Sequence, residues 1–172
     1  MDKTKIIITR EVIAKRVAEL AAELSRDYKD KNPILIGVLK GSFVFMSDLI
    51  RLMKIPVEID FIRLSSYGVC KESSGRIRVL KRLETPIKGR YVLVVEDIVD
   101  SGYTLSYLID CLKRRKPASV KVCVLFDKSS RREMEVPIDY VGFTIPDAFV
   151  VGYGLDYGEK FRHLPDLCIL EE

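Results

Sequence analysis

Apolar side chains in the first thirty residues recur at intervals of three and four, which is the spacing of one face of a helix. The members of this series are Val12, Ile13, Val17, Leu20, Ala21 and Leu24. Thr9 precedes the series and is a residue type that favours the cap position of a helix, whereas Asn32 and Pro33 close it. We therefore expect a helix from Thr9 to about Tyr28, with its apolar face on a core.

Short apolar runs and amphipathic segments alternate between residues 34 and 126. Some runs are continuously apolar, as in strands buried on both faces of a sheet, and others alternate apolar with polar side chains. The predicted strands are 34–39, 57–64, 77–83, 91–95 and 120–126, and the predicted helices between them are 43–53 and 104–115. This order predicts an α/β fold, with an open, mainly parallel sheet flanked by helices.

Two parts of the chain depart from this alternation. The segment 65–76, SSYGVCKESSGR, is polar and too long for a tight hairpin turn, so it is either a functional lid or simply a mobile loop. The last fifty residues carry only short strands, near DYVGF, FVVGY and LCIL, and we expect them to cap the main sheet. A chain of 172 residues is long enough for one domain, and we expect residues 1–172 to share a single core.

Composition and charge narrow the class of protein. Hydrophobic residues make up 48% of the chain and charged residues 31%, which is typical of a folded protein rather than a disordered one. The net charge of +4 neither requires nor excludes nucleic acid. The basic run 113–116 stands where a helix is expected to end, and the helix dipole favours cations there. We expect no nucleic-acid partner.

Neither a metal framework nor a membrane segment is indicated by the sequence. Cys70, Cys111, Cys123 and Cys168 stand singly, without a C-x-x-C pair, so zinc and disulfide frameworks are not expected. No apolar stretch approaches the roughly 20 residues that span a bilayer, and the first residues lack the apolar core of a signal peptide. We expect a cytoplasmic protein without membrane contact.

The densest chemistry lies in residues 92–105, VLVVEDIVDSGYTL. Glu96, Asp97 and Asp100 follow an apolar strand, and ligands of open α/β sheets collect at the carboxyl ends of strands. Ser101 to Thr104 run directly into a helix, whose first N–H groups suit a phosphate. The acids would repel a phosphate unless a cation or sugar hydroxyls lie between them, so a ribose phosphate with Mg²⁺ fits the whole stretch.

The segment EDIVDSGYT resembles the phosphoribosyl diphosphate-binding motif of the type I phosphoribosyltransferases. That motif is an apolar strand, two acids, two apolar residues, a third acid and S/T-G-x-T, and this chain matches each position. Four further stretches are similar to the hypoxanthine-guanine branch of the family: Leu39-Lys40-Gly41, Ser66-Tyr67, Lys128 and PDAFVVGYGLDYGEKFR at 146–162. The resemblance implies the type I phosphoribosyltransferase fold, with a hood formed mainly by residues 145–172.

The implied reaction is displacement of pyrophosphate from 5-phosphoribosyl diphosphate by a purine ring nitrogen. The resemblance implies that Glu96 and Asp97 hold the ribose hydroxyls, directly or through Mg²⁺, and that Asp100 handles the purine proton. Ser101, Gly102, Tyr103 and Thr104 would bind the 5′-phosphate, mostly through backbone, so the Tyr103 side chain is expected to be dispensable. The plainer alternatives are that the first two acids only solvate a strand end and that Asp100 only caps a helix.

The resemblance assigns the remaining positions to the other two parts of the substrates. Lys40, Gly41 and Arg162 would bind pyrophosphate, and the Leu39–Lys40 peptide bond is often cis in the family. The residues implied for the purine are Lys128, Phe149, Val150 and Asp156, of which Asp156 would also serve the pyrophosphate Mg²⁺. The alternatives are an ordinary Lys-Gly turn, a solvated lysine, a core phenylalanine and a solvated arginine.

The resemblance also implies a lid and an oligomer. Ser66 and Tyr67 would belong to a lid over the reacting centre, at about residues 65–76, and dimers or tetramers are common in the family.

Rival functions are disfavoured by the residues themselves. A phosphate-binding ATPase is disfavoured because G-x-x-x-x-G-K-[ST] does not occur, and a receiver domain is disfavoured because the acid pair arrives only at residue 96. His163, the only histidine, leaves little room for a Ser-His or Cys-His nucleophile. The stronger rival is a nucleic-acid-binding regulator of the same fold.

Overall fold

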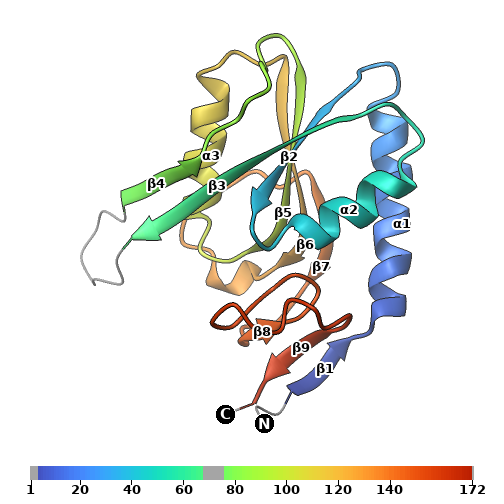
Figure 1. Ribbon diagram of the computed structural model, residues 1–172, viewed down its shortest axis with the longest axis vertical. Helices are drawn as coiled ribbons and strands as arrows, with labels where there is room; N and C mark the ends of the chain where they lie inside the picture. Colours follow the sequence, from blue (N-terminus) through green and yellow to red (C-terminus); the bar gives the residue numbers. More distant parts are fainter. Residues whose placement is uncertain (1–3, 68–75, 172) are drawn as a thin grey trace.

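The computed structural model describes residues 4–67 and 76–171, which form two sheets and three α-helices (Figure 1). The strand order of the larger sheet is β4-β3-β2-β5-β6-β7. Its strands are β2 (Ile34–Leu39), β3 (Glu58–Tyr67), β4 (Arg76–Lys81), β5 (Tyr91–Val99), β6 (Ser119–Asp127) and β7 (Tyr140–Thr144). Each neighbouring pair is parallel except β3 and β4, so the predicted open, mainly parallel sheet is confirmed.

Helices cover both faces of this sheet, and each face has its own apolar cluster. Helices α1 (Arg10–Asp27) and α2 (Phe43–Leu52) pack on one face, where Leu35, Leu93 and Leu125 are buried. Helix α3 (Tyr103–Lys113) packs on the other face, where alternate strand residues such as Ile36 and Val94 are buried. Burial on both faces explains why these strands are continuously apolar in the sequence.

The first helix begins where its cap residue predicts. The Thr9 hydroxyl accepts a hydrogen bond from the Val12 N–H at 3.5 Å, and the helix then runs to Asp27. The predicted apolar face is buried with one exception, because Val12 lies on the outer side of the first turn and is half-exposed. Val12 therefore does not belong to the core.

The smaller sheet consists of β1 (Thr4–Ile8), β9 (Leu167–Leu170) and β8 (Val150–Val151), in that order (Figure 1). Strand β1 pairs antiparallel with β9, a contact between the two ends of the chain that the sequence pattern did not predict. Tyr153, Leu155 and Leu167 share one buried cluster with α1 and the main sheet. Two of the three short strands expected in the last fifty residues, near FVVGY and LCIL, form this sheet together with β1.

Two boundaries of the main sheet differ from the prediction. Strand β5 continues past residue 95 to Val99, because its partner β6 also continues and keeps pairing with it up to Val99 and Asp127. The stretch near DYVGF was expected in the cap, but it forms β7 and extends the main sheet beside β6. Among residues 4–67 and 76–171, no helix is both long and apolar enough to cross a membrane.

Candidate active site

Two adjoining cavities lie where β2 and β5 end and the loops of the smaller sheet approach. The first, of about 300 Å³, is lined by Lys40, Gly41, Asp97, Ile98, Asp100, Lys128, Phe149, Val150, Leu155, Asp156 and Arg162. The second, of about 220 Å³, is lined by Glu96, Asp97, Ile98, Val99, Asp100, Ser101, Gly102, Thr104 and Leu105. Asp97 and Asp100 line both cavities. The structure thus gathers nearly all the predicted site residues, from segments between Lys40 and Arg162, around one branched space.

Glu96 and Asp97 lie inside β5 rather than beyond it, and both are buried. Burial raises the pKa of Glu96 well above its usual value, and the neighbouring Asp97 charge raises it further. Burial likewise raises the pKa of Asp97, although nearby N–H groups and Arg162 oppose the rise. The interpretation that these acids merely solvate a strand end is therefore wrong. Among the described residues neither Glu96 nor Asp97 forms an ion pair, and two adjacent buried carboxyl groups favour a bound cation or a ligand rich in hydroxyl groups.

Gly41 allows the loop after β2 to approach this acid pair. A Cβ atom at Gly41 would lie 1.7 Å from the Asp97 carboxylate oxygen Oδ2, a distance that no side chain tolerates. A Cβ atom at Gly154, where φ is +96°, would lie 2.4 Å from the Gly41 carbonyl oxygen. The Leu39–Lys40 peptide bond is cis, as the resemblance implies. The loop 39–42, the acid pair and the loop at residue 154 therefore meet at one point.

The loop between β5 and α3 presents a helix N-terminus to the second cavity. Gly102 caps α3 with a φ of +92°, and a Cβ atom there would lie 2.6 Å from the Met134 carbonyl oxygen. The Ser101 carbonyl accepts hydrogen bonds from the N–H groups of Glu133 and Met134 at 3.0 and 2.9 Å, which fixes the loop from outside. The first N–H groups of a helix have no partner within it, so they are available to an anion. The Tyr103 side chain is half-exposed and lines neither cavity.

Asp100 lies between the two cavities. Its carboxylate oxygen Oδ1 is 3.1 Å from Nε of Arg131, which also reaches Asp147 at 3.3 Å. The cap residue of α3 is Gly102, and no side chain provides a cap hydrogen bond there. The interpretation of Asp100 as a helix cap is therefore wrong. Its carboxylate oxygen Oδ1 is buried and, although it lies near Arg131, has no hydrogen-bond partner among the described residues.

Lys128, Phe149 and Val150 lie together in the first cavity. Lys128 is only 6% exposed, so it is not the solvated lysine of the alternative interpretation. Phe149 is 53% exposed and meets the Tyr157 ring edge-on at a centroid distance of 5.4 Å, so it is not a core residue. An exposed aromatic ring and a lysine that line the same small cavity suit a flat polar ring.

Arg162 and Lys40 bring positive charge to the edge of the first cavity. Arg162 is largely buried: Nη1 donates to the Gly154 carbonyl at 2.8 Å, and Nη2 pairs with Asp156 at 2.8 Å. It is therefore not a solvated arginine. The Lys40 ammonium group is half-exposed and pairs with Glu159 at 2.8 Å. Both cations line the first cavity, and their role in binding pyrophosphate stays a prediction.

The fit of the site to Mg²⁺ can be judged from its carboxylates. Among the described residues, no three His, Cys, Asp or Glu side chains converge into a ready-made metal site, so Glu96, Asp97 and Asp156 do not form a closed cage. Mg²⁺ commonly binds through one or two carboxylates and the phosphates of a substrate. The buried Asp97 and the half-buried Asp156, which line one cavity, fit that mode.

The predicted lid lies partly outside the described residues. Ser66 and Tyr67 form the end of β3 and pair with β4, whereas residues 68–75 are not described. Strands β3 and β4 form one edge of the main sheet, and their paired ends extend beyond the other strands (Figure 1). The role of Ser66 and Tyr67 as a lid stays a prediction.

Four residues at the site were not predicted as site residues from the sequence: Arg131, Arg132, Tyr157 and Glu159. Arg131 contacts Asp100, and Arg132 donates to the Asp100 carbonyl at 3.1 Å while pairing with Asp127. Glu159 and Tyr157 stand in GLDYGEKFR, beside predicted residues, but nothing in their spacing distinguished them. Only the cluster of cations after β6 was a usable signal.

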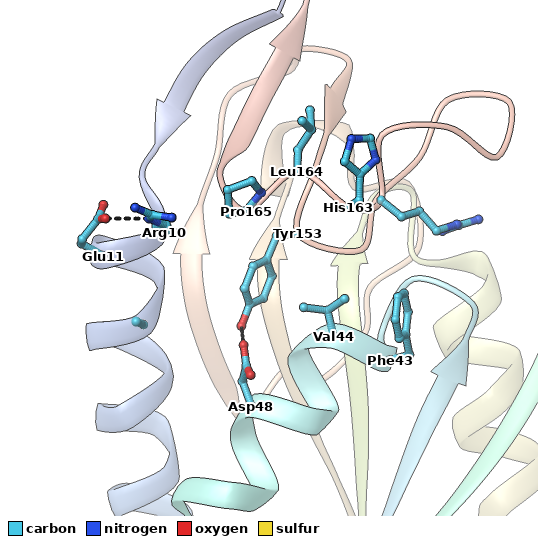
Figure 2. A pocket seen from close by; sticks show the side chains of 11 residues that line it. Arg10, Glu11, Phe43, Val44, Asp48, Tyr153, His163, Leu164 and Pro165 are labelled. Atoms are coloured by element: carbon cyan, nitrogen blue, oxygen red, sulfur yellow. Dashed lines mark hydrogen bonds and ion pairs between the residues drawn. The ribbon is translucent and has the colours of Figure 1, made fainter.

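A separate cavity of about 770 Å³ lies between the start of α1, the start of α2 and the segment 162–165 (Figure 2). The Tyr153 hydroxyl donates to Asp48 at 2.6 Å across it, and His163 lines it. Among the residues that the structure describes, Arg162 alone lines both this cavity and one of the two above. His163 therefore lines a different cavity from Glu96, Asp97 and Asp100, and its role in the chemistry is not tested by this placement.

Known proteins resemble this chain over nearly its whole length. The sequence profile of the phosphoribosyl transferase domain matches residues 5–158. Hypoxanthine-guanine phosphoribosyltransferase of Bacillus subtilis is 49% identical over 170 residues, covering 99% of this chain and 94% of that protein. Hypoxanthine phosphoribosyltransferase of Haemophilus influenzae is 48% identical over 172 residues, covering 97% and 96%. The crystal structure of a hypoxanthine-guanine phosphoribosyltransferase from Bacillus anthracis has a TM-score of 0.94 at 46% identity, covering 99% of this chain and 100% of that one.

Proposed function

Because the chain belongs to the phosphoribosyl transferase domain family, we infer that it is a purine salvage enzyme, a hypoxanthine-guanine phosphoribosyltransferase. It transfers the 5-phosphoribosyl group from 5-phosphoribosyl diphosphate to hypoxanthine or guanine, giving IMP or GMP and pyrophosphate. The observation that carries this proposal is the pair of adjoining cavities. One contains a helix N-terminus for a phosphate, the other an aromatic ring and a lysine for a purine, and the two share Asp97 and Asp100.

Each part of the substrates has a matching part of the site. The amides at Ser101 to Thr104 hold the 5′-phosphate, and the buried Glu96 and Asp97 face the ribose hydroxyls. Lys128 donates to the 6-oxo group of the purine, which separates oxopurines from adenine, because adenine carries an amino group there. These assignments follow from the resemblance and are supported by the placement of the residues.

The reaction forms one bond and breaks another at the anomeric carbon of the sugar. A purine ring nitrogen attacks this carbon, the bond to the pyrophosphate oxygen breaks, and the purine proton passes to Asp100. Positive charge builds on the sugar ring and negative charge on the departing pyrophosphate, which Lys40 and Arg162 offset. Closure of a lid that includes Ser66 and Tyr67 would keep water from the sugar.

Mg²⁺ is the proposed cofactor, and Asp97 and Asp156 would hold it together with substrate oxygens. Glu96, next to Asp97, would contribute a further carboxylate to the same ion. When bound, it supplies positive charge that neutralises the diphosphate and the buried carboxylates. Assembly into a homodimer or homotetramer is also proposed. Half-exposed Phe43 and Leu52 on α2 and Val12 on α1 provide apolar surface that such an assembly would bury.

The rival function, a nucleic-acid-binding regulator of the same fold, is not favoured. The relatives that match the whole chain are named as phosphoribosyltransferases. The site also retains Asp100, Lys128 and Phe149, which a protein that only senses the sugar diphosphate does not need.

An absorbance assay with the sugar diphosphate and Mg²⁺ tests this proposal, with hypoxanthine, guanine, xanthine and adenine as parallel acceptors. We expect turnover of hypoxanthine or guanine. With adenine, kcat/KM should be at least about a hundredfold lower, because the buried Lys128 ammonium group, a donor, would face the 6-amino group of adenine, which is also a donor. Comparable turnover of adenine would contradict the role of Lys128, and no turnover of any purine would contradict the function.

A further inference from the structure

Glu159 joins the two cations of the proposed pyrophosphate subsite. Its carboxylate oxygen Oε2 lies 2.8 Å from Nζ of Lys40 and 3.4 Å from Nη2 of Arg162. One oxygen atom thus contacts a lysine from the loop after β2 and an arginine from the segment before β9. A hydrogen bond from Lys40 lowers the pKa of Glu159, so the carboxylate is charged at neutral pH.

The backbone holds Glu159 in this place. Its N–H donates to Asp156 at 2.9 Å, and its φ of +68° lies in the left-handed region, which side chains other than glycine rarely adopt. Asp156 in turn pairs with Arg162 at 2.8 Å. The turn 156–162 therefore aims the glutamate back across its own loop at the cations.

The contacts of Glu159 are near the surface and can be broken. The side chains of Glu159 and Lys40 are 62% and 43% exposed, and exposed ion pairs of this kind each contribute little to stability. A polyanion that reaches both cations would replace two weak contacts with stronger ones.

We propose that Glu159 is an affinity-determining residue, an internal anion that occupies Lys40 and Arg162 until the diphosphate group displaces it. This inference rests on the proposed function, which assigns those two cations to pyrophosphate. Because the incoming diphosphate must first displace Glu159, the sugar diphosphate binds more weakly. The product pyrophosphate is released more easily for the same reason, since Glu159 can return to both cations. Glu159 touches no reacting atom, so its effect is on binding and not on the chemical step.

Calorimetric titration of the enzyme with pyrophosphate and Mg²⁺ tests the proposal. Glu159→Gln should lower the Kd of pyrophosphate and the KM of the sugar diphosphate by about three- to tenfold, the size expected for two exposed ion pairs. The single-turnover rate should stay within about twofold. Glu159→Asp keeps the charge, but its side chain is too short to contact both cations. It should therefore lower the Kd of pyrophosphate as Glu159→Gln does.

A matched control and two contrary outcomes make the test decisive. Glu58→Gln removes another exposed glutamate, paired with Arg90 at 2.6 Å at the opposite end of the sheet, and should leave the Kd unchanged. An unchanged Kd in Glu159→Gln, or a Kd in Glu159→Asp equal to that of the unsubstituted enzyme, would overturn the proposal and leave the proposed function intact. Failure of the unsubstituted enzyme to bind pyrophosphate would instead count against the proposed function.

Discussion

At the scale of single residues, the site contains acidic side chains in buried positions, where their charged forms are unfavourable. Glu96 and Asp97 are two adjacent acids buried in a strand, which disfavours their charged forms. Gly41 leaves room for the acid pair, because a Cβ atom there would collide with the Asp97 carboxylate and displace it. The sequence identified these residues as a group but did not predict their burial, because burial depends on strands and loops that are distant in the chain.

Asp100 provides the sharpest test at this scale. Asp100→Asn keeps the shape of the side chain but cannot accept a proton, so kcat should fall by about 10²- to 10⁴-fold. The KM of the sugar diphosphate should change by less than about threefold, since the amides of the phosphate loop are unchanged. Steady-state kinetics measure both values.

The neighbouring loop supplies the control for this prediction. Tyr103 lines neither cavity, so Tyr103→Ala should leave kcat/KM within about tenfold. If Asp100→Asn retained more than a tenth of the activity, or if Tyr103→Ala lost as much as Asp100→Asn, the proposed roles would be wrong.

At the scale of elements, the strands and helices with strong periodicity were predictable and those that depend on distant pairing were not. Helix α1 was found from its apolar spacing and its cap at Thr9. Strand β1 was missed because its stability comes from pairing with β9, more than 150 residues away. The end of β5 was misplaced for a similar reason: polar Glu96 and Asp97 look like the end of a strand until β6 pairs beside them.

Asp60 connects β3 to the turn after β4 and carries a prediction about pH. It accepts hydrogen bonds from the N–H groups of Phe61, Glu84 and Thr85 at 2.7 to 2.8 Å. Burial alone would raise its pKa, but these hydrogen bonds outweigh burial and lower it. A lowered pKa in the folded state means that Asp60 stabilises the protein above its unfolded pKa, and that this contribution is lost as the pH falls through the folded value.

Urea unfolding of Asp60→Asn at pH 7 and pH 3 measures this contribution. We expect the free energy of unfolding to fall by about 1–3 kcal/mol at pH 7, because the substituted amide lacks the negative charge and places an N–H donor opposite backbone N–H groups. At pH 3 the loss should be smaller. Glu84→Gln is the control, since its side chain is 82% exposed and should change the free energy of unfolding by less than about 0.5 kcal/mol. Equal losses at both pH values would show that the charge of Asp60 is not what stabilises the fold.

At the scale of the whole molecule, the candidate site lies where the two sheets meet. The main sheet supplies Glu96, Asp97 and Asp100, and the segment around the smaller sheet supplies Phe149, Asp156 and Arg162, with the loop at Gly41 between them. The motifs predicted most of the residues that line the two cavities. Its geometry, the bridging Glu159 and the brace of Arg131 and Arg132 emerge only when segments from across the chain are brought together.

The most direct test of the central claim is a crystal structure of the protein with IMP, pyrophosphate and Mg²⁺. We predict that the 5′-phosphate lies on the amides of residues 101–104, the ribose beside Glu96 and Asp97, and the base between Lys128 and Phe149. Pyrophosphate should contact Lys40 and Arg162, with Glu159 displaced from both. A nucleotide bound elsewhere, away from residues 96–104, would contradict the account.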